Sequence, residues 1–97
     1  MRKRLEITEK ELTRFAGYLR REEREVSTIE AYLRAARKFA AWLEGRAVTK
    51  ELAAGWKSWL LAQGYRPVSV NAMLAAVNKL LVCMGREDCK VRYLRLQ

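Results

Sequence analysis

Apolar residues recur every three or four positions along four segments of this chain, the spacing that places them on one face of an α-helix. The longest run follows Ser27 and ends at Gly45. Its apolar stripe holds Ile29, Tyr32, Leu33, Ala36, Phe39, Ala40 and Leu43. A stripe of this length is stable only when other helices cover it, so the pattern predicts an all-α fold.

Each of the four helices has a start signal and a stop signal. We expect them at residues 8–22, 27–44, 49–64 and 67–85. Thr8 and Ser27 each precede a glutamate three residues later, which is the capping-box pattern. Thr49 is a third cap, and Pro67 suits a first helical turn. The second half of the chain repeats the pattern of the first, so we expect two helical hairpins packed together.

The two ends of the chain lack this pattern. Residues 1–7 are basic, carry no apolar core of a signal peptide and are expected to be flexible. Residues 90–96 alternate charged and apolar side chains, as an extended segment does, but the chain offers no partner strand. We therefore expect a helical domain at residues 8–86 and an extended connector at residues 87–97 that packs on nothing and is mobile.

Composition narrows the function classes. The 97 residues carry 20 Lys and Arg against 11 Asp and Glu, and this net charge of +9 favours a polyanionic partner such as nucleic acid. Histidine is absent, no glycine-rich phosphate loop occurs, and Cys83 and Cys89 lack further metal ligands. We expect reduced thiols, no metal, no cofactor and no enzyme activity in this chain. No apolar run approaches the roughly 20 residues that span a bilayer, so we expect a cytoplasmic protein.

Two helices place basic side chains beside small ones on the face opposite their apolar stripe. In the second expected helix this face holds Ala31, Arg34, Lys38 and Ala41, with Arg37 nearer its edge. In the fourth it holds Asn71, Ala72, Ala75 and Lys79. Small residues let a helix approach a DNA groove, where Lys and Arg meet phosphates and Asn can bond an adenine edge. The alternative is an ordinary solvated face, since surface helices commonly expose Lys and Arg.

Hydroxyl and tryptophan side chains add further expectations. Ser27, Thr28 and Ser69 lie at helix starts, where capping explains them, although the same helix N-termini can also receive a phosphate. The spacing favours core packing for Trp56 and Trp59. Trp42 lies off the main stripe and is expected at the surface or at an interface.

Several segments resemble parts of one protein family. Residues 26–32 (VSTIEAY) and 39–43 (FAAWL) resemble the second helix of the core-binding domain of tyrosine recombinases. Residues 64–71 (GYRPVSVN) and 74–80 (LAAVNKL) resemble the fourth helix of that domain. Residues 89–97 (CKVRYLRLQ) are similar to the connector that enters the catalytic domain in integrases of phages and conjugative transposons.

The resemblance implies a SAM-like bundle of four helices that forms half of a clamp around double-stranded DNA, with the second and fourth helices across the major groove. It also implies that the catalytic residues reside in a separate domain, so Tyr93 is not a nucleophile. In the parent protein, other recombinase protomers would bind the same DNA, whereas the isolated domain is expected to be monomeric. The expected DNA-binding residues are Ser27, Thr28, Arg34, Arg37, Lys38, Arg66, Ser69, Asn71 and Lys79.

Two other functions remain open from the sequence. One is a helical protein-interaction module of the SAM-like kind, for which Trp42 and Leu61 would supply exposed apolar contacts. The other is an autonomous regulator of the helix-turn-helix kind, which is weakened by the lack of a tight turn between two short helices.

Overall fold

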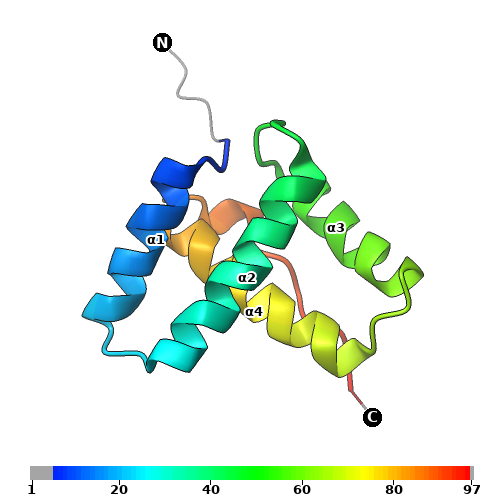
Figure 1. Ribbon diagram of the computed structural model, residues 1–97. Coiled ribbons are helices and arrows are strands. Elements are labelled where there is room, and N and C mark those ends of the chain that lie inside the picture. Colours follow the sequence, from blue (N-terminus) through cyan, green and yellow to red (C-terminus); the bar gives the residue numbers. More distant parts are fainter. Residues whose placement is uncertain (1–5, 97) are drawn as a thin grey trace.

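The computed structural model describes residues 6–96 and consists of helices joined by short turns (Figure 1). The elements are α1 (Glu9–Arg21), α2 (Val26–Leu43), α3 (Lys50–Ala62), α4 (Pro67–Cys83) and the short 3-10 helix η1 (Glu87–Cys89). No strand occurs within residues 6–96. The predicted all-α fold with four helices is confirmed.

The second helix of each hairpin lies at the centre of the bundle. α2 and α4 cross and share the most extensive contact between any two helices, as Figure 1 shows. α1 packs on α2 and α4 from one side, and α3 packs on the same two helices from the other. Among the described residues α1 and α3 do not touch. The fold therefore leaves part of the central α2–α4 pair uncovered between the two outer helices.

Two apolar clusters hold the bundle together, and both draw on α2 and α4. The first joins the C-terminal half of α2 to α3, where the Phe39 and Trp56 rings lie 5.0 Å apart between centroids. The second joins α1 to α2 and to Leu80 of α4. The apolar stripe predicted for α2 is thus buried at both ends. Ile7, expected to be flexible, instead packs against both clusters, while the rest of that basic N-terminus up to residue 5 lies outside the described residues.

Helix starts agree with the sequence at Thr8, Thr49 and Pro67 and differ at the start of α2. The Thr8 amide donates to the Glu11 carboxylate at 3.2 Å, and the Thr49 hydroxyl accepts from the Leu52 amide at 3.0 Å. The prediction that Ser27 caps α2 is wrong. The Ile29 amide already donates to the Glu25 carbonyl at 3.0 Å, so helical bonding begins before Ser27 and Glu25 takes the cap position.

The expectation that residues beyond about Glu87 have no packing partner is also wrong. Cys89 and Val91 are buried in the first apolar cluster, together with Leu74 and Leu81 of α4. The physical reason is that α3 and α4 leave an apolar groove between them, which the tail (residues 90–96) covers in an extended conformation. Burial of this kind stabilises an extended segment that has no partner strand.

Two asparagines of α4 complete the docking of the tail. Asn78 donates to the Val91 carbonyl and accepts from the Val91 amide, both at 2.9 Å. Asn71 makes the same pair of bonds to Leu94, at 2.9 and 2.7 Å. We call Asn71 and Asn78 the amide clamp. Because an extended main chain needs partners for its N–H and C=O groups when buried, the clamp takes the place of a neighbouring strand.

Candidate nucleic-acid interface

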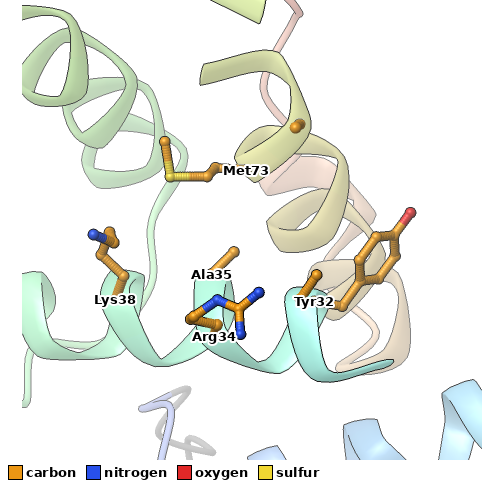
Figure 2. Close-up of a pocket in the computed structure, with 7 residues that line it drawn as sticks. Tyr32, Arg34, Ala35, Lys38 and Met73 are labelled. Carbon is orange, nitrogen blue, oxygen red and sulfur yellow. The ribbon is translucent and has the colours of Figure 1, made fainter. Parts of the chain in front are cut away.

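A groove runs between α2 and α4 on the uncovered side of the central pair. It encloses about 350 Å³ and is lined by Ala31, Tyr32, Arg34, Ala35, Lys38, Ala72 and Met73. Figure 2 shows Tyr32, Arg34 and Lys38 extending from α2 along one edge, with Met73 of α4 opposite. We call this the basic groove. Four of the residues on the two predicted outer faces, Ala31, Arg34, Lys38 and Ala72, therefore come together.

Arg34 and Arg37 are the most accessible cations of α2. Both side chains are exposed, and neither has an acidic partner among the described residues. They line a second hollow of about 310 Å³ together with Glu30 and Leu33. Arg34 thus lines both this hollow and the basic groove, and its guanidinium could bind a phosphate located in either of them.

Lys38 is held in one direction by an aromatic residue. Its ammonium donates to the Tyr65 hydroxyl at 2.7 Å and lies 5.1 Å from the centre of the same ring. An ammonium has three N–H donors, so two remain for another acceptor. The contact fixes a flexible side chain at the groove wall before any ligand arrives.

Lys79 is shared with an acidic neighbour. Its ammonium lies 3.3 Å from a Glu22 carboxylate oxygen and 5.8 Å from the Tyr18 ring centre. Partial desolvation raises the pKa of Glu22, but hydrogen bonds from Lys79 and other neighbours outweigh it and hold that pKa below its ordinary value. The charge of Lys79 is therefore partly neutralised by α1, and a phosphate would have to compete with Glu22.

Asn71 does not occupy the position expected of a base reader. One amide hydrogen and one carbonyl lone pair are used by Leu94 of the tail. A bidentate bond to adenine needs an N–H and a lone pair on the same edge of the amide, and the docked tail occupies that edge, so it excludes this role. The spacing of seven residues between Asn71 and Asn78 places both on one face of α4 and was the available signal for a paired role.

The remaining predicted residues lie at helix starts outside the basic groove. Ser27 and Ser69 are exposed, Thr28 is half-buried, and no side-chain cap bond forms at the start of α2 or α4. Arg66 lines a separate hollow of about 510 Å³ with Pro67, Val68, Arg95 and Leu96. None of these four residues lines the basic groove with Arg34 and Lys38.

The tryptophans differ in part from the prediction. Trp56 is fully buried, as expected. Trp59, expected in the core, is 37% exposed, whereas Trp42 is half-buried beside it with the two ring centres 6.4 Å apart. The difference arises because α3 is covered on one side only, so a residue three positions after Trp56 reaches the edge of the packed face. Leu61 is 39% exposed on the same helix, as expected.

Residues 6–96 contain no group of three His, Cys, Asp or Glu side chains placed to hold a metal ion. Cys83 and Cys89 are free thiols, and burial raises the pKa of both. None of the helices formed by the described residues is long and apolar enough to cross a membrane.

Comparison with protein families gives a match over most of the chain. The family model for the phage integrase N-terminal SAM-like domain matches residues 12–88. No curated protein and no solved structure matches the chain. The matched span includes the whole α2–α4 pair with the basic groove, and it stops just before the docked tail.

Proposed function

The chain belongs to the phage integrase family through its N-terminal SAM-like domain, and from this membership we propose that it grips duplex DNA through the basic groove. The observation that carries the proposal is the groove itself. It places Arg34 and Lys38 of α2 opposite the exposed Ala72 of α4. The net charge of +9 supports a polyanionic partner, and the small side chains allow close approach to a duplex.

We propose a contribution of position and affinity rather than of chemistry. This domain is the N-terminal part of integrases and not their catalytic domain. In the parent protein, a cytoplasmic tyrosine recombinase, residues 8–86 would hold the core site beside other protomers. Residues 87–97 would lead toward the catalytic domain, which would cleave and rejoin the strands. The isolated chain should then neither nick DNA nor form a covalent adduct with it.

A duplex titration at two salt concentrations tests the groove. Weak binding is expected, with a dissociation constant on the order of 10⁻⁴–10⁻⁶ M. Arg34→Gln and Lys38→Gln each remove one charge from the groove, and each should weaken binding to every duplex and reduce the slope of log affinity against log salt by about 0.9. Arg20→Gln removes the same charge from an exposed residue of α1 and is the matched control. Equal effects of all three variants would indicate non-specific attraction between the charged chain and DNA, and would refute the proposal that the groove binds the duplex.

The protein-interaction alternative rests on the exposed apolar residues of α3. Trp59 and Leu61 present two large side chains to solvent, and Trp42 extends the aromatic surface. If this surface binds a second protein copy, sedimentation should show association that depends on concentration and persists at high salt. Trp59→Ser would abolish it, because aromatic anchors dominate such interfaces. If sedimentation shows only a monomer at all concentrations, this surface does not bind a second copy of the chain.

A further inference from the structure

A further hollow lies on the side of α4 that faces the tail, away from the basic groove. It encloses about 160 Å³ and is lined by Ala75, Asn78, Lys79, Val82, Lys90 and Tyr93. The last two belong to the tail, so the hollow exists only while the tail is docked. We call it the tail hollow.

The docking geometry decides which tail side chains face this hollow. The amide clamp holds the main chain of Val91 and Leu94 against α4, and both side chains pack into the first apolar cluster. From the other side, α3 reaches the same main chain, because Lys50 donates to the Lys90 carbonyl and Lys57 donates to the Arg92 carbonyl at 3.0 Å. The tail is therefore held on both edges. Lys90 and Tyr93 remain at the surface, with the main chain behind them fixed in register.

The chemistry of the tail hollow is that of an anion site. Within residues 6–96, no hydrogen bond or ion pair engages the Lys90 ammonium or the Tyr93 hydroxyl. Lys79 adds a second ammonium, which it shares with Glu22. Two ammonium groups and a phenol offer hydrogen-bond donors to a tetrahedral oxyanion, and no carboxylate lines the hollow.

The tail hollow and the basic groove border the same strip of α4. Ala72 lines the groove, Ala75 lines the hollow, and Lys79 follows them at helical spacing. We propose that the tail hollow binds one phosphate of the DNA backbone, so that the docked tail forms a second flank of the interface. The inference rests on the proposed DNA-binding function and adds Lys90 and Tyr93 to it.

Charge neutralisation within the tail separates this site from general attraction. Lys90→Gln removes a charge from the hollow, and Arg92→Gln removes one from an exposed tail residue outside it. If Lys90 neutralises a phosphate, the affinity advantage of the unaltered chain over Lys90→Gln should shrink about 3.5-fold between about 50 and 200 mM salt. For Arg92→Gln the ratio should stay nearly constant. Tyr93→Phe should weaken binding about 2- to 12-fold without changing the salt slope, as the loss of one neutral hydrogen bond does.

Each outcome of this titration decides a different claim. Equal salt behaviour of Lys90→Gln and Arg92→Gln, while Arg34→Gln still reduces the slope, would overturn the tail hollow and leave the basic groove standing. Absence of salt-dependent duplex binding by the unaltered chain would overturn both. Amide chemical shifts give a second readout, since duplex should move the Lys90 and Tyr93 signals. Silence at both positions with shifts in α2 would also refute the inference.

Discussion

Replacing Asn78 by alanine should detach the tail from α4. Asn78 is 6% exposed and Val91 is 5% exposed, so the two hydrogen bonds between them lie out of reach of water. Alanine leaves both the N–H and the C=O of Val91 without a partner. An unsatisfied buried group costs about 1–3 kcal/mol, so the two groups together would cost about 2–6 kcal/mol if the tail stayed in place.

Release of the tail limits that cost. When the tail detaches, water solvates the Val91 main chain, and the loss becomes the free energy of docking. The side chain of Val91 alone contributes about 1.5–3 kcal/mol of burial to docking, and Cys89 adds to it. We therefore expect Asn78→Ala to lower the free energy of unfolding by about 2–4 kcal/mol, which is the lower part of the range calculated for a tail that stays in place.

Denaturant unfolding and amide hydrogen exchange together check this prediction. The Val91 and Leu94 amides should lose their protection in Asn78→Ala, while amides in the middle of α2 should change only by the global loss. Asn71→Ala is the matched control, because the same pair of bonds is removed at a half-buried position and should cost less. A Val91 amide that stays protected, with a loss under about 0.5 kcal/mol, would refute the reasoning.

Three further outcomes follow from the helix starts and the core. Thr49→Ala should lose about 1 kcal/mol of stability, whereas Ser27→Ala should stay within about 0.5 kcal/mol of the unaltered chain. Equal losses in thermal unfolding would contradict the cap assignment. Leu80→Ala should cost about 2–5 kcal/mol in denaturant unfolding, because Leu80 is fully buried where α1, α2 and α4 meet, and a loss under about 0.5 kcal/mol would show that it is not a core residue. The hydrogen bond from Thr8 lowers the pKa of Glu11, so its stabilising effect should be present above the ordinary carboxyl pKa and disappear as pH falls through the lowered value; an NMR titration of Glu11 with an ordinary midpoint would contradict this.

The helices could be predicted from the sequence because their signals are local. The apolar stripe of α2 and the cap at Thr49 each depend on residues within a few turns of one another. The start of α2 was misplaced because Ser27 is a good cap by type, whereas the chain reverses just before it, with Glu23 in the left-handed region at φ 58°. That reversal lets helical bonding begin at Glu25, and residue type alone does not reveal it.

The docking of the tail could not be predicted in the same way. The bonds from Asn78 and Asn71 span 13 and 23 residues of sequence, and they engage main-chain groups that every residue possesses. No periodicity in residues 90–96 records such a contact. The prediction for Asn71 was wrong for the same reason. A helical wheel shows Asn71 as exposed because it contains no information about the tail, which returns to cover this residue. For the proposed DNA-binding surface, charge and periodicity place the cations of α2 on one face of the helix but do not reveal that Lys79 is paired with Glu22.

The amide clamp constrains the length of the tail more strongly than its sequence, both in natural variants and in engineered ones. Seven residues of helix separate Asn71 from Asn78, a rise of about 10.5 Å, and three extended residues separate Val91 from Leu94, a rise of about 10 Å. The two spacings match, and the clamp holds only main-chain atoms. The fold should thus accept many substitutions among the outward side chains of the tail. A single inserted or deleted residue between Val91 and Leu94 would break the match and misalign whatever a fusion appends to the tail.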